Sequence, residues 1–118
     1  IVQIESVDAI NNLEEILSVD IDGFIIGPYD LSASMGKPGE FDHPDVVNAL
    51  TKVKEVSQEM GAVSGFHVIP PDSGVVIKMI QEGYKFIAFS LDTLFLGLKC
   101  GEEMDKIKSL RHFESRQK

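Results

Sequence analysis

The sequence predicts an α/β fold in which parallel (β/α) units form half of a TIM-type (β/α)8 barrel. Short apolar runs alternate four times with amphipathic helical stretches along the 118 residues. No β-hairpin signal joins any two of these runs, so each strand is expected to return through a crossover helix and to pair in parallel. Polar residues follow several of the predicted strands, as they do at the carboxyl ends of barrel strands.

The first strand and helix occupy residues 1–22. Residues 1–4 are a short apolar run that predicts a strand, and Ser6 stands where the N-cap of a following helix belongs. An Asp-Gly pair at residues 22–23 interrupts the helical pattern. The buried face of this single helix is predicted to contain Ala9, Ile10, Leu13, Ile16 and Leu17.

The second unit begins with the continuous apolar run at residues 24–26, which is typical of a parallel strand buried on both faces. The segment of residues 29–41 is longer than a simple connection between a strand and a helix, which predicts a functional loop. A helix then starts at Pro44, is capped by Asp42 or His43, and ends at Gly61. Its buried face is predicted to contain Val46, Val47, Leu50, Val53 and Val56.

The third and fourth units follow the same pattern. Residues 62–68 predict a strand, and Asp72 caps a helix that Gly83 ends. The buried positions of that helix are predicted to be Val75, Val76, Met79 and Ile80. Residues 85–89 predict the fourth strand, residues 93–100 an apolar helical segment, and the chain after Gly101 an amphipathic or frayed polar tail.

A doubly wound open sheet is the alternative architecture for this order of elements. The chain lacks the glycine-rich phosphate-binding fingerprint of such sheets, and its polar residues gather at several strand ends, which favours the barrel. Four strands alone leave two unpaired sheet edges, which invite pairing with a further segment or a second copy. We therefore predict that residues 1–118 form one (β/α)4 half-barrel domain.

Composition narrows the classes of partner. With 43% hydrophobic residues the chain can bury a core, and its net charge of −8 argues against nucleic acid or an anionic membrane as a partner. Cys100 is the single cysteine, which excludes an internal disulfide framework, and we expect it to be a partly buried apolar residue. No apolar run reaches the roughly 18–20 residues of a membrane span. These observations favour a cytoplasmic protein.

Two carboxylates follow the first two predicted strands. In the run VQIES, Glu5 directly follows the apolar residues of the first strand, and Asp30 follows the second strand in GFIIGPYDLSASMG. Because neighbouring parallel strands lie about 4.8 Å apart, acidic side chains at their carboxyl ends can converge on one divalent cation. Two carboxylates with open coordination positions suit Mg²⁺ or Mn²⁺ better than zinc. A Schiff-base mechanism would need a lysine at the carboxyl end of a strand. Lys85 lies at the opposite, amino end of the fourth predicted strand.

Each of these residues also has a structural interpretation. A glutamate at position 5 is favoured by the dipole of the helix that follows, and an aspartate after Gly-Pro, such as Asp30, is common as a cap or turn residue. Gln3 can satisfy backbone groups inside the barrel. The joint occurrence of Glu5 and Asp30 at neighbouring strand ends favours the metal site.

The remaining polar candidates are weaker. His67 lies near the carboxyl end of the third strand, where catalytic groups of barrels collect, but solitary histidines are mostly structural. His43 and Asp92 are predicted to cap helices. Ser32 and Ser34 have no neighbouring base in the sequence and are predicted to be hydrogen-bonding residues of the loop.

Four segments resemble a known family. The runs VQIES, GFIIGPYDLSASMG, FDHPDVV and GYKFIAFSLDTLFLG are similar to the carboxyl-terminal half of the HpcH/HpaI aldolases, the class II pyruvate aldolases of the phosphoenolpyruvate/pyruvate barrel superfamily. The resemblance covers nearly the whole chain. It implies a (β/α)8 barrel whose fifth to eighth units are present here, and cleavage of a 2-keto-4-hydroxy acid to pyruvate and an aldehyde. Because Ile1 is not the product of a start codon, we expect residues to precede it.

The resemblance also implies roles for individual residues. Glu5 and Asp30 match the metal ligands of the family, whose members use Mg²⁺, Mn²⁺ or Co²⁺. Gln3 matches a residue that orients the bound oxoacid, and the backbone amides of Tyr29 and Asp30 would receive the pyruvate carboxylate. Family members are oligomers, so we expect a homo-oligomer whose last helix packs on a neighbouring subunit. The apolar surface for this contact would comprise Leu94, Phe95, Leu96 and Leu98, and the alternative is that these side chains pack on their own barrel.

The chain departs from the family pattern in two respects. The general-base histidine and the substrate-binding arginine of the family belong to the first half of the barrel, and no residue here matches them. We therefore expect the general base to come from the other half of the barrel, and His67 is the weaker candidate within these residues. The third strand carries Phe66 and His67 where smaller or aliphatic residues would line the pocket for the substrate methyl group, which bears on aldehyde specificity.

Two functions follow from the sequence. The first is a metal-dependent carbon–carbon lyase that acts through a metal-stabilised pyruvate enolate and depends on another half-barrel for full activity. The second is a catalytically incomplete half-barrel that serves as an oligomerising or oxoacid-binding module. Retention of both carboxylates favours the lyase.

Overall fold

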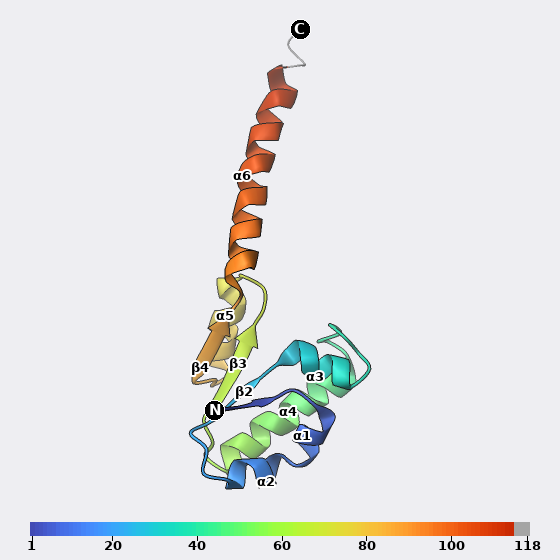
Figure 1. The fold of residues 1–118 in the computed structure, drawn as a ribbon, viewed down its shortest axis with the longest axis vertical. Coiled ribbons are helices and arrows are strands. Elements are labelled where there is room, and N and C mark those ends of the chain that lie inside the picture. Colours follow the sequence, from blue (N-terminus) through green and yellow to red (C-terminus); the bar gives the residue numbers. More distant parts are fainter. Residues whose placement is uncertain (115–118) are drawn as a thin grey trace.

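A computed structural model describes the backbone of residues 1–114 and the side chains of residues 1–110. A mixed body of strands and helices carries helix α6 (Asp92–Glu114) as a single projecting arm (Figure 1). The molecule therefore measures 71 Å along its longest axis but only 27 and 21 Å along the others. Among the described residues, no helix has the length and the apolar character that crossing a membrane would require.

Four strands form one parallel sheet whose spatial order follows the sequence. Their bounds are Val2–Ile4 for β1, Phe24–Ile26 for β2, Ser64–Val68 for β3 and Phe86–Phe89 for β4. In the register, Ile4 lies beside Ile26, Ile26 beside Phe66, and Phe66 beside Ile87. The predicted parallel α/β fold is thereby confirmed. The carboxyl ends of all four strands meet at one edge.

Helices form the crossovers between these strands. They are α1 (Val7–Asn11) and α2 (Leu13–Ser18) after β1, α3 (Pro28–Ser34) and α4 (Pro44–Glu59) after β2, and α5 (Ser73–Gln81) after β3. Three predicted N-caps are present. Ser6 Oγ accepts from the Ala9 amide at 3.2 Å, His43 Nδ1 from the Asp45 amide at 3.2 Å, and Asp72 Oδ1 from the Gly74 amide at 2.7 Å. One backbone amide in the first turn of each of α1, α4 and α5 thus has a side-chain acceptor at the predicted position.

The core lies between one face of the sheet and the helices. The strands contribute alternate residues to it, as the two-residue period of a strand requires. These strand residues are Ile4, Phe24, Ile26 and Val68, and the helices add Ile10, Leu13, Val53 and Met79. The opposite face carries Gln3, Ile25, His67, Phe86 and Ala88, and none of these is fully buried. In a closed barrel that second face is the interior.

Four predictions about the helices are wrong. The first predicted helix is divided at Asn12 into α1 and α2. Residues 28–34 of the predicted loop form helix α3, because Pro28 occupies the first helical position, where its missing N–H is harmless. Val47 and Ile80 are exposed rather than buried, at 45% and 57%. Val47 lines the groove between α4 and α5, where it remains open to solvent.

The predictions for the carboxyl-terminal segment are also wrong. Gly101 does not end the helix. Helix α6 continues past it and includes the predicted polar tail as far as residue 114. Lys99 and Lys106 both pair with Glu103, at 2.7 and 2.8 Å, and these pairs one turn apart support a helix whose residues 92–110 are all exposed. Cys100 is exposed and not partly buried, because it lies on this projecting arm.

Candidate active site

The carboxyl end of β1 presents a linked pair of polar side chains. Gln3 Nε2 donates a hydrogen bond of 2.7 Å to Glu5 Oε2. Gln3 and Glu5 are two residues apart on an extended segment, so their side chains project from the same face of the sheet. A glutamine amide that donates to one carboxylate oxygen fixes the orientation of the carboxylate and leaves the other oxygen available to a ligand.

Gly27, at the end of the neighbouring strand, gives this pair its space. A Cβ atom at position 27 would lie 2.6 Å from Gln3 Nε2 and 3.3 Å from Glu5 Oε2. The backbone of Gly27 has an ordinary φ of −97°, so space and not conformation requires a glycine here. The two side chains of β1 therefore extend sideways over the end of β2, on the face that becomes the interior of a barrel.

Asp30 follows Gly27 in the first turn of α3. Ile4 and Ile26 are register partners, so Glu5 and Gly27 leave the sheet side by side and Asp30 follows three residues later. The Asp30 side chain is exposed. The structure thus places both predicted metal ligands beyond the carboxyl ends of adjacent strands.

The residues around Asp30 are held by side-chain hydrogen bonds. Ser32 Oγ donates to the Tyr29 carbonyl at 2.8 Å and accepts from the Gly39 amide at 3.0 Å. Ser34 Oγ donates to the Leu31 carbonyl at 2.8 Å and accepts from the Val7 amide at 3.1 Å. Both serines are hydrogen-bonding residues, as predicted. Ser34 ties α3 directly to the start of α1, the helix that follows Glu5.

Tyr29 contributes its backbone and not its ring to this end of the sheet. The ring packs edge-on against Phe41, with centroids 4.9 Å apart. Tyr29 and Asp30 are the second and third residues of α3, so their N–H groups have no acceptor within the helix. These are the two amides that, by the family resemblance, are expected to receive an oxoacid carboxylate.

The donor set at this end of the sheet fits an oxygen-coordinated divalent cation. Glu5 and Asp30 are hard carboxylates, and Gly27 keeps the space beside the Glu5 carboxylate free of a side chain. Two carboxylates leave open positions for water or substrate oxygens, as magnesium sites commonly do. Within residues 1–114, no cluster of three or more His, Cys, Asp and Glu side chains could hold a metal ion. The candidate set is therefore the pair alone.

The other predicted candidates occupy different places. His67 is half-buried on the same face of the sheet as Gln3, and its register partner is Ala88. Asp92 Oδ1 accepts from the Thr93 amide at 2.7 Å, which is a local helix-start role. The Lys85 amide bonds to the Ser64 carbonyl at the amino end of β4, the end opposite to the candidate site. Phe66 does not line the inner face: its ring packs against Tyr84 on the helix side, with centroids 5.1 Å apart.

Two features were not found from the sequence. The requirement for glycine at position 27 depends on the reach of Gln3 and Glu5 across a strand, which no local pattern encodes. Ser90, at the exit of β4, has a φ of 57°, and its buried Oγ lacks a hydrogen-bond partner. A serine in the left-handed region has no distinctive sequence signal.

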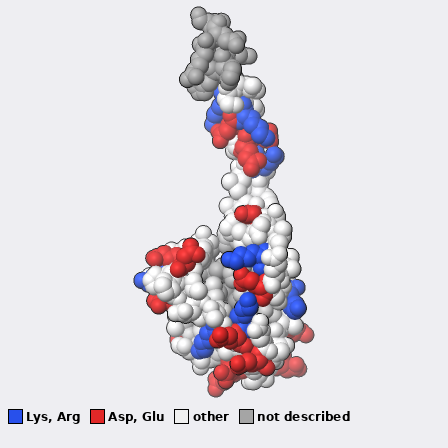
Figure 2. All heavy atoms as spheres, turned by 180° about the vertical axis from the view of Figure 1, so that it is seen from behind, with Lys and Arg blue, Asp and Glu red and all other residues white. Residues whose placement is uncertain are grey.

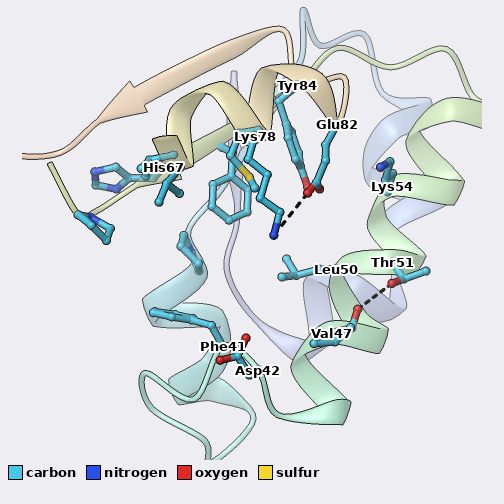
Figure 3. A pocket seen from close by; sticks show the side chains of 16 residues that line it. Phe41, Asp42, Val47, Leu50, Thr51, Lys54, His67, Lys78, Glu82 and Tyr84 are labelled. Atoms are coloured by element: carbon cyan, nitrogen blue, oxygen red, sulfur yellow. Dashed lines mark hydrogen bonds and ion pairs between the residues drawn. The ribbon is translucent and has the colours of Figure 1, made fainter. Parts of the chain in front are cut away.

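A groove of about 590 Å³ lies between α4 and α5, apart from the polar pair of β1 (Figure 3). Leu50 and Thr51 line it from α4, and Lys78 and Glu82 form an ion pair of 3.9 Å on the other side. Burial, with a smaller contribution from the Glu82 carboxylate, raises the pKa of Tyr84 at this groove to about 12. The groove is on the helix side of the sheet, whereas Gln3 and Glu5 are on the other.

Comparison with known proteins decides the family. A family model described as HpcH/HpaI aldolase/citrate lyase matches residues 1–96. The chain belongs to this family. The resemblance of its four segments to the HpcH/HpaI aldolases is therefore confirmed.

Individual HpcH/HpaI relatives agree with this assignment. The chain is 36% identical over 111 residues to a 2-keto-3-deoxy-L-rhamnonate aldolase of Escherichia coli K12, and the match covers 92% of the chain and 40% of that protein. The crystal structure of an HpcH/HpaI aldolase from Desulfitobacterium hafniense superimposes with a TM-score of 0.82 at 31% identity, covering 90% of the chain and 41% of that structure. Macrophomate synthase superimposes with a TM-score of 0.78 at 28% identity, covering 95% and 40%.

These HpcH/HpaI matches confirm the predicted TIM-type architecture, of which the chain supplies four parallel units. The chain spans about 40% of the length of the curated relatives it matches. Membership of the family supports lyase chemistry in general.

Proposed function

We propose that the protein is a divalent-metal-dependent aldolase that cleaves a 2-keto-4-hydroxy acid into pyruvate and an aldehyde. The observation that carries this proposal is the Gln3–Glu5 pair, which lies over Gly27 at the strand end that leads to Asp30. Glu5 and Asp30 would hold the metal, which we take to be Mg²⁺ or Mn²⁺, with Co²⁺ as the alternative. The relative in Escherichia coli is a 2-keto-3-deoxy-L-rhamnonate aldolase, and its name supports a 2-oxo acid as substrate.

The roles of the chain's own residues follow from their chemistry. A bound divalent cation supplies Lewis acidity for the negative charge that develops on the ketone oxygen as the carbon–carbon bond breaks. Gln3 holds the Glu5 carboxylate in a fixed orientation through its 2.7 Å hydrogen bond. The backbone amides of Tyr29 and Asp30 donate to the substrate carboxylate. These contacts position the 2-oxo acid so that its distal half extends into the barrel.

A binding experiment tests this proposal. Mn²⁺ together with pyruvate should raise the melting temperature of the protein, because a ligand that binds only the folded state stabilises it. Glu5→Gln should lose the shift. Glu14→Gln, an exposed glutamate of α2, should keep it and serves as the matched control. A shift of equal size in Glu5→Gln and the wild type would refute the metal site.

One observation favours a second candidate, an oxoacid-binding module without turnover. The two arginines of the sequence, Arg111 and Arg116, both lie beyond residue 110, far along the chain from β1. A carboxylate-binding arginine would then have to come from another copy or another segment. One assay of the complete gene product separates the two functions. A binding module binds pyruvate and Mn²⁺ but forms no retro-aldol product, whereas an aldolase binds them and also forms that product.

We also propose that the protein self-associates through α6. Where α6 leaves the body, its surface is largely uncharged (Figure 2). The exposed fractions of Leu94, Phe95, Leu96 and Leu98 there range from 36% to 66%. Burying such a band against a second copy would remove apolar area from water. Sedimentation should find an oligomer that Leu96→Glu dissociates and Lys37→Glu does not, and a monomeric wild type would contradict the proposal.

A further inference from the structure

His67 lies level with the candidate site, two strands away from it. In the register, Ile4 pairs with Ile26 and Ile26 with Phe66, so the next residues, Glu5, Gly27 and His67, form one row across the sheet. All three belong to the face opposite the helices, because Ile4, Ile26 and Phe66 contact the core. The row ends at Ala88, the register partner of His67.

The space between Glu5 and His67 holds no side chain of the row. Gly27 stands between them, and a Cβ there would collide with Gln3 and contact Glu5. Gln3 and Glu5 therefore extend towards the side of the sheet on which His67 stands. The other neighbour of His67 is the small residue Ala88. The imidazole is half-buried, and Gly27 is the residue of the row that separates it from the Gln3–Glu5 pair.

The distance decides which part of a ligand His67 can reach. Two strand spacings separate the backbones of Glu5 and His67, which is roughly 10 Å. The described residues contain no cluster of three or more His, Cys, Asp and Glu side chains that could hold a metal ion, and Mg²⁺ prefers oxygen ligands to an imidazole, so His67 is not assigned to the metal. A substrate fixed at its oxoacid end beside Glu5 would instead bring its distal carbons towards the imidazole.

His67 borders the groove between α4 and α5 and is not part of the hydrophobic core of the described residues. Its neighbours in the strand, Phe66 and Val68, supply the contacts of β3 with the helices, and Val68 is 1% exposed. In the close view of the groove, His67 lies at the edge, apart from Leu50 and Thr51 of α4 (Figure 3). An imidazole brings one donor and one acceptor to an otherwise small and apolar stretch of the inner face.

We propose that His67 is a specificity-determining residue that hydrogen-bonds a hydroxyl group on the aldehyde half of the substrate. The preferred substrates are then 2-keto-4-hydroxy acids whose aldehyde product carries a hydroxyl next to its carbonyl. The inference rests on the proposed aldolase function. It assigns His67 a role in selecting the aldehyde and not in activating pyruvate.

The test separates these two steps in the complete gene product. Aldol addition of pyruvate to glycolaldehyde, which carries the hydroxyl, is compared with addition to acetaldehyde, which lacks it. His67→Leu should lower kcat/KM for glycolaldehyde about ten- to hundredfold and change kcat/KM for acetaldehyde by less than about threefold. The reason is that the variant loses a hydrogen bond that only the aldehyde with the hydroxyl makes. His67→Asn, which keeps a donor and an acceptor, should restore part of the loss and also covers the case in which His67→Leu does not fold.

A second readout does not involve the aldehyde. Exchange of the pyruvate methyl protons with D₂O, followed by NMR, reports activation of pyruvate alone. It should be the same in the wild type and in both His67 variants. Equal losses for both aldehydes, no loss for either, or slower proton exchange in His67→Leu would overturn the role of His67. Absence of exchange in the wild type would refute the aldolase itself and the inference with it.

Discussion

The side-chain amide of Gln3 donates a 2.7 Å hydrogen bond to the carboxylate of Glu5. This pair lies over Gly27, where a Cβ would approach Gln3 Nε2 to 2.6 Å. The shape of the candidate site is therefore set by a missing side chain on one strand and by two polar side chains on its neighbour. Changes at Gly27 should act on ligand binding more than on the fold.

Gly27→Ala should weaken Mn²⁺ binding at least tenfold while destabilising the fold by about 1 kcal/mol, because the new methyl group displaces flexible side-chain ends rather than backbone. Isothermal titration with Mn²⁺ and chemical denaturation measure the two effects. Gly97→Ala is the matched control: nothing lies within 4 Å of its Cβ. That variant should bind Mn²⁺ normally, and unchanged affinity in Gly27→Ala would show that the Gln3–Glu5 pair is not part of the site.

Gly65→Ala should act on stability instead. Its Cβ would overlap two carbon atoms of the Phe86 ring, which is a rigid group and cannot yield as a flexible chain end does. We expect a loss of about 2–3 kcal/mol, in the upper range for overpacking. In a double-mutant cycle, Phe86→Leu should recover much of this loss. Additive effects of the two substitutions would mean that the close approach of Phe86 to Gly65 is not the cause.

Ser90→Gly should stabilise the protein. Ser90 has a φ of 57°, which glycine adopts without steric penalty, and its buried hydroxyl has no hydrogen-bond partner. Relief of both should add about 1–2 kcal/mol to the free energy of unfolding. Chemical denaturation measures the change, with Ser90→Ala as the control that removes the hydroxyl but keeps the strained backbone. A destabilised Ser90→Gly would imply an interaction of Ser90 that the fold does not reveal.

Tyr84 should make stability fall at high pH. Because burial raises its pKa to about 12, the folded protein keeps the phenol proton between pH 10 and 12, where the unfolded chain loses it. The stabilisation is fully present below pH 10 and is lost as the pH rises towards 12. After allowance for partial solvent screening, the loss is about 1–2 kcal/mol.

Unfolding at pH 9 and pH 11.5 measures this effect. Tyr84→Phe should show a smaller decline than the wild type. Tyr29→Phe, which changes a half-exposed tyrosine, should decline as the wild type does. An undiminished decline in Tyr84→Phe would assign the pH dependence to other groups.

The sequence was a good guide to elements whose signals are local. The apolar run at residues 24–26, the caps Ser6 and Asp72, and proline at the start of α4 all lie as predicted, because strand periodicity and capping are properties of a few adjacent residues. The predictions failed where tertiary context decides. Val47 has the spacing of a buried residue but lines the open groove between α4 and α5 and is 45% exposed.

The candidate site was partly predictable for the same reason. Strand ends identify Glu5 and Asp30, and parallel pairing places them beyond adjacent strands. The space kept by Gly27 and the row from Glu5 to His67 depend on the register between strands, which the sequence of one strand does not encode. Helix α6 was misjudged because its ion pairs, such as Lys99 with Glu103, support a helix whose residues 92–110 are all exposed.

The central claim is that Glu5 and Asp30 share one divalent cation. The most direct measurement is anomalous diffraction from crystals of the complete gene product grown with Mn²⁺ and pyruvate. The account predicts one manganese peak about 2.1 Å from an oxygen of each carboxylate, with Gln3 still bonded to Glu5. A manganese peak bound to neither carboxylate, or carboxylates that point away from each other around an ordered pyruvate, would contradict it.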